Sequence, residues 1–349
     1  MKYAWIERHR LQYPVTTMCE LLEVSRSGLN TARSRAPSPR AAEDARLIEQ
    51  IRHAQQRHRG RYGRRRMTQH IAQQQGRCVN HKRVARLMRE HGLQSWVRKR
   101  FRVTTTDSGH RLPLAPNVLQ RDFAASAPNR KWLADITYVP TDEGWLYLAL
   151  VLDLHARKIV GWAMDEMMPQ ELTLRALDAA LGWRDPDSTL VHHSDHGSQY
   201  AAGDYRKRLA ARGITVSMSG KGNCWDNAPM ESFNGTLKVE CVHAQHFTTR
   251  EQARRAIVEY IGYYNTDRLH SSLGYMTPAA FEHCWYAQHH AQSPQALDVE
   301  CTGMPAAFDA HQRRGWHDGL KGSLCRASPA LDPVVPANTL RPPPAPAQN

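Results

Sequence analysis

The sequence predicts an α/β domain with a mixed sheet, preceded by an all-α region with helix-turn-helix spacing. Three apolar, strand-like segments follow one another between residues 131 and 164, and helical and strand-like segments then alternate up to residue 219. Between residues 16 and 92 the segments instead have helical patterns with capping residues at their ends. Strands in antiparallel succession followed by helix and strand in alternation are typical of a mixed sheet in an α/β layer.

The amino-terminal segment, 1–35, is expected to contain a pair of short helices. The stretch "TTMCELLEVSRSGLNTARSR" predicts a helix through Leu22, a turn, and a second helix that Ser25 caps. This is helix-turn-helix spacing, although a pair of helices occurs in any small bundle. The stretch "APSPRAAED", with two prolines, is expected to be a linker.

A second helix-turn-helix-like domain is expected over 36–110. A helix is predicted from about Ala42 to His58, and "MTQHIAQQQG" predicts another that ends at Gly76. The stretch "NHKRVARLMREHG" predicts a third helix, which Asn80 caps and Gly92 ends. The apolar face of this last helix consists of Val84, Leu87 and Met88.

The positive charge is concentrated in this second helical domain. The formal net charge is +14, and residues 51–100 hold fifteen Lys and Arg against the single acid Glu90. A solvated charge run is the simpler interpretation of most basic segments, but a surplus this concentrated favours a nucleic acid as partner. The stretch "WVRKRFRVTTT" continues the charge, as a solvated arm or as a DNA contact. The residues predicted to hold DNA phosphates are Arg61, Arg64, Arg65, Arg66, Lys82, Arg83 and Arg86.

The α/β domain is expected over 125–286, and its strands come from five stretches. These are "KWLADITYVP", "WLYLALVLDL", "ARKIVGWAM", "STLVHHS" and "ITVSMS". The stretch "MPQELTLRALDAALG" predicts a helix with Pro169 near its start and Gly182 past its end, and "AAGDYRKRLAARG" predicts another.

The glycine-rich stretch "GKGNCWDNAPM" is expected to be a mobile loop before a helix from about Asn227 to Glu240. A further helix and a polar turn are expected in "TTREQARRAIVEYIGYYNTDRLHSSLG". After Tyr286 the periodicity is lost, and the proline-rich tail, 287–349, is expected to be disordered.

Several classes of protein are excluded by composition. The longest apolar run, Trp145 to Leu154, has ten residues and contains Asp153, which is too short for a membrane span. The amino terminus is charged throughout and shows no secretory signal, so we expect a cytoplasmic protein. Seven scattered cysteines without a CxxC pair indicate reduced thiols rather than a disulfide framework or a zinc ribbon.

Three acids have contexts that suggest a shared site. Asp135 lies inside the first strand, on the face of Leu133 and Thr137, while Asp195 follows the fourth strand and Glu231 lies in the first turns of a helix. Each alone is more simply interpreted as a cap or one half of a buried ion pair. Together they form a set of oxygen ligands, which suits Mg²⁺ or Mn²⁺ and a pair of such ions in phosphoryl transfer.

Zinc is a less favoured alternative. His192, His193 and His196 surround Asp195. Adjacent residues of a strand point to opposite faces, however, so His192 and His193 do not easily bind one ion.

Four motifs in order resemble a known family. They are "DITYV", "HSDHGSQY", "DNAPMESFNGTLKVE" and "YNTDRLHSSLGYMTPAAF", with fifty-nine residues between Asp135 and Asp195 and thirty-five between Asp195 and Glu231. They resemble the DDE transposases and retroviral-type integrases, specifically the catalytic reading frame (OrfB type) of bacterial insertion-sequence family three, over about residues 3–285. The resemblance implies a ribonuclease-H-like catalytic core in which Asp135, Asp195 and Glu231 are both the catalytic and the metal-binding residues.

The resemblance also implies roles for the helix that carries the glutamate. Lys238 occupies the family's basic position two turns later and is expected to contact DNA, and it shares a helix face with Glu231 and Asn234. Asn234 itself is expected to be a solvated polar residue. Asn227 is expected to contact DNA or to cap the helix. Other matches to the motifs are Tyr138, Gly197, Gln199 and Tyr200, and Met230, Phe233 and Leu237 form the opposite, core-facing stripe.

The activity implied by the resemblance is Mg²⁺-dependent DNA cleavage and strand transfer. The implied partners are double-stranded DNA, further copies of the chain on paired transposon ends, and an upstream helix-turn-helix and leucine-zipper module joined by frameshifting. The tail after Tyr286 has no counterpart in the family. A DNA-binding regulator that uses only the helical region, or a nuclease that never joins strands, are the alternatives.

Overall fold

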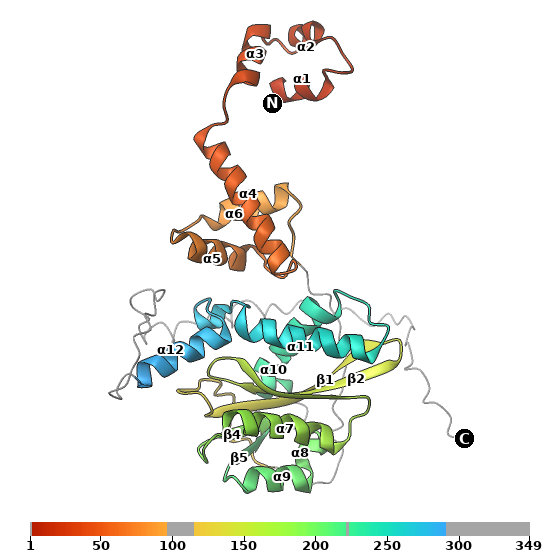
Figure 1. Ribbon diagram of the computed structural model, residues 1–349, viewed down its shortest axis with the longest axis vertical. Helices are drawn as coiled ribbons and strands as arrows, with labels where there is room; N and C mark the ends of the chain where they lie inside the picture. Colours follow the sequence, from red (N-terminus) through yellow and green to blue (C-terminus); the bar gives the residue numbers. More distant parts are fainter. Residues whose placement is uncertain (1, 96–114, 221–222, 291–349) are drawn as a thin grey trace, which may run out of the picture. The chain divides into compact units, whose positions relative to one another are not determined.

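The computed structural model describes residues 2–95, 115–220 and 223–290 (Figure 1). The basic stretch "WVRKRFRVTTT" and the tail from residue 291 lie outside the described residues. The DNA contact considered for the first and the disorder expected of the second therefore stay predictions.

The first three helices form a small separate core. They are α1 (Lys2–His9), α2 (Val15–Leu21) and α3 (Arg26–Ser34). Ser25 caps α3, since its Oγ accepts a hydrogen bond from the backbone N–H of Gly28 at 2.9 Å, as the sequence predicts. The buried residues of this unit are Ile6, Met18, Cys19 and Leu29.

The next three helices form the second helical unit. They are α4 (Pro39–Arg57), α5 (Arg64–Gln75) and α6 (His81–Glu90). Gly76 ends α5 with a φ of 63°, a left-handed conformation that favours glycine, and the Asn80 side chain caps α6 through the backbone N–H of Lys82 at 2.8 Å. The predicted helix-turn-helix spacing is therefore confirmed. Its core contains Leu47, Ile51, Tyr62, Met67, Ile71, Val84, Leu87 and, from farther along the chain, Leu269.

A five-stranded mixed sheet organises the rest of the described chain. Its strands lie in the order β3-β2-β1-β4-β5, in which β1 pairs antiparallel with β2 and parallel with β4, β3 antiparallel with β2, and β5 parallel with β4. This confirms the predicted ribonuclease-H-like class. The strands are β1 (Lys131–Thr141), β2 (Gly144–Asp153), β3 (Lys158–Asp165), β4 (Val191–Ser194) and β5 (Thr215–Met218).

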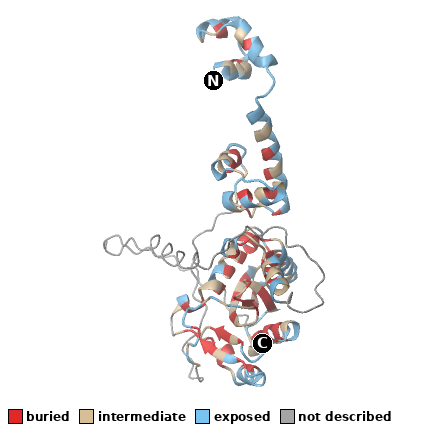
Figure 2. Ribbon diagram, turned by 90° about the vertical axis from the view of Figure 1, so that its left-hand side faces the viewer, coloured by how far each residue is buried: buried red, intermediate tan, exposed pale blue. Residues whose placement is uncertain are grey.

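Helices cover both faces of the sheet, and the strands between them are mostly buried (Figures 1 and 2). One face packs against α7 (Gln170–Arg184), α8 (Ser198–Ala201) and α9 (Gly203–Ala210), and the other against α10 (Ala228–Leu237) and α11 (Arg250–Thr266). Alternation along β1 explains the division: Trp132 and Ala134 lie in the first layer, while Leu133 and Val139 lie in the second.

Shorter elements complete the layer that contains α10. A 3₁₀ turn, η1 (Cys224–Asn227), precedes α10, and a π-helical segment, η2 (Lys238–Val242), continues it. A second 3₁₀ turn, η3 (Ser271–Leu273), comes after α11, and α12 (Pro278–His290) is the last described helix.

One helix end and the start of the tail differ from the sequence prediction. Gly182 lies inside α7, which continues to Arg184 and ends at Asp185, a residue in the left-handed region with φ 39°. A Cβ at Gly182 would meet nothing within 4 Å, so the glycine is an exposed helical residue and no cap. Residues 287–290, expected to begin the disordered tail, are helical, because α12 runs to His290. Its buried Glu282 pairs with Lys158 and Arg184, which holds the helix against the sheet layer.

None of the described helices combines the length and the apolar character that crossing a lipid bilayer requires.

Candidate active site

The two predicted catalytic aspartates lie on neighbouring parallel strands. The register of β1 and β4 pairs Lys131 with Val191 and Leu133 with His193. Continued by two residues, the same register places Asp135 opposite Asp195, which comes directly after β4. The parallel crossover thus brings two carboxylates that are far apart in the sequence to one edge of the sheet.

Backbone N–H groups orient both carboxylates. Asp135 Oδ1 accepts from the N–H of Ile136 at 2.9 Å, and Asp195 Oδ1 accepts from the N–H of Gly197 at 3.0 Å. Gly197 has an ordinary φ of −63°, so backbone permissiveness is not the reason for glycine there. A Cβ at this position would lie 3.0 Å from Asp195 Oδ1 and 3.2 Å from Gln199 Oε1, so the reason is space.

Helix α10 presents the third predicted acid and its neighbours. Met230, Phe233 and Leu237 are buried against the sheet, as expected, which turns the face of Glu231, Asn234 and Lys238 away from that core. The Asn234 Nδ2 donates a 2.7 Å hydrogen bond to Asp135 Oδ2. The expectation that Asn234 is merely solvated was therefore wrong. The geometry makes it a positioning residue for Asp135.

Lys238 lies beside the same carboxylate. Its Nζ is 4.6 Å from the centre of the Tyr138 ring, a cation–π contact that holds the ammonium over β1. Lys238 is the first residue of the π-helical segment that follows α10. Burial lowers the pKa of Lys238, and the charge of Asp135 opposes that shift.

The electrostatics link all three acids. Burial raises the pKa of Asp135 well above its usual range, and the charges of Asp195 and then Glu231 add to the increase, while the hydrogen bond from Ile136 and the charge of Lys238 oppose it. A cation bound between such carboxylates would relieve their electrostatic repulsion. The charges of Asp195 and Glu231 thus both reach the Asp135 carboxyl.

The donor set fits a hard divalent cation. Asp135, Asp195 and Glu231 offer only carboxylate oxygens, the ligands that Mg²⁺ and Mn²⁺ prefer. Within the described residues, however, no three His, Cys, Asp or Glu side chains form a ready metal-binding group. Glu231 is an exposed residue in the first turn of α10.

The loop before α10 is anchored by a residue that the sequence motifs did not single out. Asp226 is 3% exposed and accepts hydrogen bonds from Gly220 N–H at 2.9 Å, Asn117 Nδ2 at 2.9 Å and Arg121 Nε at 2.7 Å. Burial opposes ionisation here, but the bonds from Gly220 and Arg121 hold the pKa of Asp226 below its usual value. Asp226 is the first residue of the motif "DNAPMESFNGTLKVE", but the sequence prediction gave it no role.

Asn227 has a structural contact in place of the expected DNA contact. It is 5% exposed, and its Nδ2 donates to the carbonyl of Ala134 at 3.2 Å, so it ties the start of α10 to β1 next to Asp135. It stands at the helix start, but its side chain makes no capping hydrogen bond. The Asn227 side chain is therefore too buried to contact a DNA duplex.

The histidines around Asp195 do not form a zinc site in the described geometry. His192 and His193 point to opposite sides of β4, as alternation predicts: His192 Nε2 meets the Tyr205 hydroxyl at 3.1 Å, and the His193 ring contacts Ser217 and Ser219. Burial lowers the pKa of His192 to about 3 and that of His193 to about 4, so both rings are neutral at physiological pH.

Two of the predicted DNA-binding arginines contact the α/β layer instead. The Arg61 guanidinium lies over the rings of Tyr260 and Tyr263, and its Nε donates to the carbonyl of Glu240 at 3.1 Å. Arg66 is half-buried and lies 3.4 Å from the Glu240 carboxylate. These arginines join helices rather than face solvent.

The remaining predicted contacts divide into paired and exposed residues. Arg83 and Arg86 form ion pairs with Glu43 and Asp44 of α4 at 2.6 to 2.8 Å, which neutralises much of their charge. The exposed side chains of Arg64, Arg65 and Lys82 make no hydrogen bond or ion pair with any other residue in the described part of the chain. Sequence spacing alone did not separate these groups, because the acids that pair with Arg83 and Arg86 lie about forty residues earlier.

Comparison with known families agrees with this architecture. Two models described as "Integrase core domain" match residues 125–224 and 212–278, and one described as "HTH-like domain" matches residues 42–101. Among solved structures, the chain is similar to the integrase catalytic core domain of HTLV-2 in complex with magnesium. That similarity has 15% identity and a TM-score of 0.35, over 46% of this chain and all of that one.

Relatives with curated descriptions match most of the chain. A 31 kDa protein of insertion element IS600 from Shigella sonnei is 48% identical over 265 residues, which are 76% of this chain and 97% of the relative. The transposase InsF for insertion sequence IS3A from Escherichia coli strain K12 is 41% identical over 285 residues, 81% of this chain and 98% of the relative. Identity at this level over nearly the whole relative is sufficient for assignment: the chain belongs to the IS3 family of insertion-sequence transposases.

Proposed function

We propose that this protein is a DNA transposase that cleaves and joins DNA strands with Asp135, Asp195 and Glu231 as its catalytic and metal-binding residues. The observation that carries the proposal is the parallel register of β1 and β4, which sets residues 135 and 195 side by side under the helix that presents Glu231. Family membership supports the reaction type.

The reaction has two steps that differ only in the attacking oxygen. In the first, water attacks a phosphodiester at a transposon end, and the bond to the 3′ oxygen breaks to leave a 3′-hydroxyl. In the second, that hydroxyl attacks another phosphodiester, one P–O bond forms, and the displaced 3′ oxygen leaves with the proton. Joining one transposon end to the other would give a circular intermediate before integration. In each step one P–O bond forms as another breaks, with water supplying the new oxygen in the first step and the 3′-hydroxyl in the second, so no oxidant and no covalent enzyme intermediate is needed.

The cofactor would be Mg²⁺ or Mn²⁺, as two ions held by the three carboxylates. When bound, such ions activate the attacking oxygen and stabilise the leaving one. The protein's own residues prepare the site. Asn234 keeps Asp135 in one orientation, the Ile136 and Gly197 N–H groups hold the two aspartates, and Lys238 provides a cation for a substrate phosphate.

The partners in this proposal are double-stranded DNA at transposon ends and target, and further copies of the chain on paired ends. Arg64, Arg65 and Lys82 are the basic residues most suited to hold phosphates, since they are exposed and have no partner among the described residues. An upstream helix-turn-helix and leucine-zipper module would complete end recognition. The protein would act in the bacterial cytoplasm, on the nucleoid.

A strand-transfer assay tests the proposal. Labelled duplexes that carry the terminal inverted repeats are incubated with the full chain and Mg²⁺, and the cleaved and joined products are separated. Joined product should disappear in Asp135→Asn and in Glu231→Gln. It should persist in Asp178→Asn, which removes an exposed acid of α7 that pairs with Arg208.

Two other outcomes would overturn it. Hydrolysis without any joining would identify a nuclease. DNA binding without chemistry, unaltered in Asp195→Asn, would identify a regulator that uses only the helical region.

A further inference from the structure

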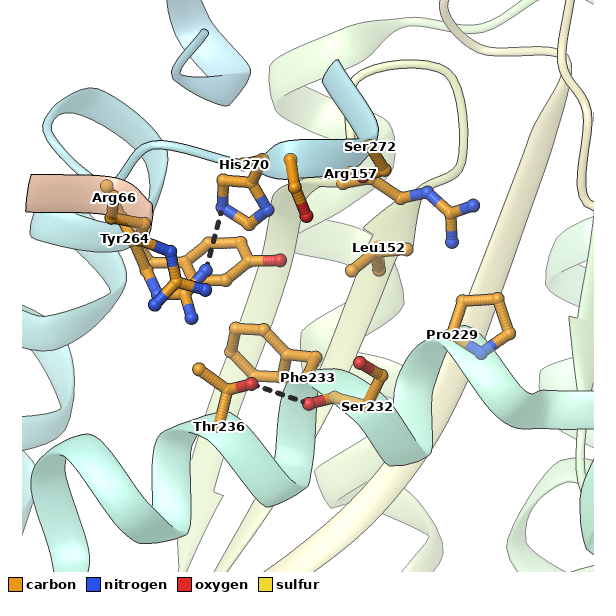
Figure 3. A pocket seen from close by; sticks show the side chains of 12 residues that line it. Arg66, Leu152, Arg157, Pro229, Ser232, Phe233, Thr236, Tyr264, His270 and Ser272 are labelled. Atoms are coloured by element: carbon orange, nitrogen blue, oxygen red, sulfur yellow. Dashed lines mark hydrogen bonds between the residues drawn. The ribbon is translucent and has the colours of Figure 1, made fainter. Parts of the chain in front are cut away.

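A cavity of about 310 Å³ lies beside α10 (Figure 3). Four elements surround it: α10, the end of β2 with the turn after it, the end of α11 with the loop after it, and α5. Its lining is Arg66, Leu152, Arg157, Pro229, Ser232, Phe233, Thr236, Tyr264, Arg268, His270, Ser271 and Ser272. Three guanidinium groups and no carboxylate thus line the cavity.

Two of the three guanidinium groups share a single carboxylate outside the lining. Arg268, 4% exposed, donates to Glu240 through Nε at 2.9 Å and Nη2 at 2.8 Å, and Arg66 lies 3.4 Å from the same acid. Tyr260 also donates to Glu240, at 3.0 Å. The single negative charge of Glu240 therefore faces the two positive charges of Arg66 and Arg268, and Arg157 adds a third positive charge.

Arg157 is the uncompensated cation of the cavity. Its half-buried guanidinium forms no hydrogen bond or ion pair with any residue in the described ranges, and Figure 3 shows it projecting toward Pro229. Burial lowers the pKa of Arg157, as it does that of Arg66, but an arginine stays charged at physiological pH. A half-buried cation without a counter-ion costs free energy, which an anion in the cavity would offset.

Neutral hydrogen-bond donors also face the cavity. The hydroxyl groups of Ser232, Ser271 and Ser272 have no hydrogen-bond partner among the described residues, whereas the Thr236 hydroxyl donates to the Ser232 carbonyl at 2.8 Å. Burial and the charge of Arg268 lower the pKa of His270 to about 2, so its ring adds no charge. A tetrahedral oxyanion needs several N–H and O–H donors around a positive charge, and these residues provide both.

We propose that this cavity is a binding site for a phosphate group, held mainly by Arg157 with the hydroxyls of Ser232, Ser271 and Ser272. It is separate from the three acids, because Ser232 and Thr236 lie on a different face of α10 from Glu231, Asn234 and Lys238. It also gives a role to the motif "YNTDRLHSSLGYMTPAAF", whose Tyr264, Arg268 and His270 line it. The phosphate belongs either to a DNA backbone or to a free phosphate compound.

Thermal unfolding of the full chain tests the site without any chemistry. The unfolding midpoint is measured in sodium phosphate and in sodium chloride of equal ionic strength. Phosphate should raise the midpoint of the wild-type protein, and Arg157→Gln should weaken phosphate binding by at least about tenfold. In chloride, Arg157→Gln should be as stable as the wild type or more so, because it removes a buried charge without a partner.

Arg212→Gln is the matched control. It removes one positive charge from an exposed pair with Asp185, so it should respond to phosphate as the wild type does. Arg157→Lys keeps the charge but lacks the forked geometry, and it should bind phosphate with intermediate strength. This variant also keeps the test decisive should Arg157→Gln fold poorly.

Binding to a transposon-end duplex without divalent ions distinguishes the two sources of phosphate. For a DNA phosphate, Arg157→Gln should bind at least about tenfold more weakly than Arg212→Gln, with a shallower salt dependence. One methylphosphonate substitution in the duplex should then weaken the wild type but not Arg157→Gln. Equal duplex binding by both variants, with phosphate stabilisation lost only in Arg157→Gln, would identify a free phosphate compound.

The proposal is overturned if Arg157→Gln and Arg212→Gln behave alike in both the thermal and the duplex experiment. Because neither measurement involves cleavage or joining, this result would leave the proposed transposase chemistry unaffected. Conversely, loss of strand transfer in Asp135→Asn says nothing about the cavity.

Discussion

The neighbours of Asp135 orient its carboxylate by hydrogen bonds and also disfavour its negative charge. Two donors, the Ile136 N–H and the Asn234 amide, order its carboxylate, while the charges of Asp195 and Glu231 disfavour its ionised form. In the proposed function, a bound cation would relieve this repulsion while the two donors keep the carboxylate oriented. The hydrogen bond from Asn234 is the part of this arrangement that a substitution can isolate.

Replacing Asn234 with alanine should reduce strand transfer by about 10- to 100-fold, because the carboxylate that it orients becomes free to rotate. Affinity for duplex DNA without divalent ions should stay unchanged, since Asn234 holds an acid rather than a phosphate. Strand-transfer rates at saturating DNA and a parallel binding titration measure the two effects. Full activity in Asn234→Ala would refute the positioning role.

At the level of elements, strand β3 and helix α7 pack against each other at very short distance. A Cβ on Gly161 would lie 2.4 Å from the Ala176 carbonyl oxygen and 2.7 Å from the Ala180 Cβ, so the strand and the helix touch through a glycine. The same helix contains Gly182, where added atoms would meet open space. Substituting these two glycines with alanine should therefore change the stability of the protein in opposite directions.

Gly161→Ala should lower the free energy of unfolding by about 1–3 kcal/mol, because strand and helix must separate to admit a methyl group. Gly182→Ala, the matched control, should raise it by about 0.5–1 kcal/mol, since alanine has the better helix propensity. Urea unfolding followed by circular dichroism measures both. Equal effects of the two substitutions would contradict the packing described for β3 and α7.

At the scale of the whole molecule, Glu240 connects segments that lie far apart in the sequence. It accepts hydrogen bonds from Arg268 and Tyr260 and pairs with Arg66 of α5. Leu269 joins the hydrophobic core of α4 to α6, and the Tyr62 hydroxyl donates to the Asp267 carbonyl at 2.9 Å. The second helical unit and the α/β layer consequently share buried contacts.

Glu240→Gln should destabilise the protein by about 3–5 kcal/mol, because it leaves the buried Arg268 cation without its counter-charge. Glu259→Gln removes an acid from an exposed pair with Arg59 and should cost less than about 1 kcal/mol. Urea unfolding of the two variants and of the wild type measures these losses of stability. A Glu240→Gln protein as stable as Glu259→Gln would show that this network is dispensable.

Buried histidines should make stability fall in mild acid. Burial lowers the pKa of His58 to about 4, of His192 to about 3 and of His270 to about 2, whereas the unfolded chain titrates near 6.5. The unfolded state therefore takes up protons first as pH falls. The stability from these neutral rings is complete above about pH 6.5 and decreases below it, by about 1.4 kcal/mol per histidine for each pH unit.

Urea unfolding at pH 7.5 and at pH 5.5 measures this loss. In His192→Phe, the difference in unfolding free energy between the two pH values should be smaller by about 1.4 kcal/mol, because one titrating ring is gone. A difference equal to that of the wild type would exclude His192 from the effect.

Local sequence signals predicted the elements well. Ser25 and Asn80 cap helices because their short side chains reach backbone N–H groups within the same turn, and Gly76 ends α5 because it accepts a positive φ. Gly182 misled the prediction of a helix end because an exposed glycine is tolerated within a helix when the packing of α7 on the sheet supports it. Asn234 and Arg66 were misjudged because their partners lie 99 and 174 residues away.

The amino-acid sequence by itself determined most of the helices and strands and the basic character of the second helical unit, and it singled out Asp135, Asp195 and Glu231 as candidate site residues, since these depend on short-range patterns and motif spacing. Only the tertiary structure decided which basic residues remain exposed, that Asn234 holds Asp135, and that Arg157 is left without a counter-charge in a cavity. The physical reason is that charge and hydrogen-bonding groups are satisfied by whatever the fold brings within a few ångströms, and the fold brings together residues that the chain keeps far apart.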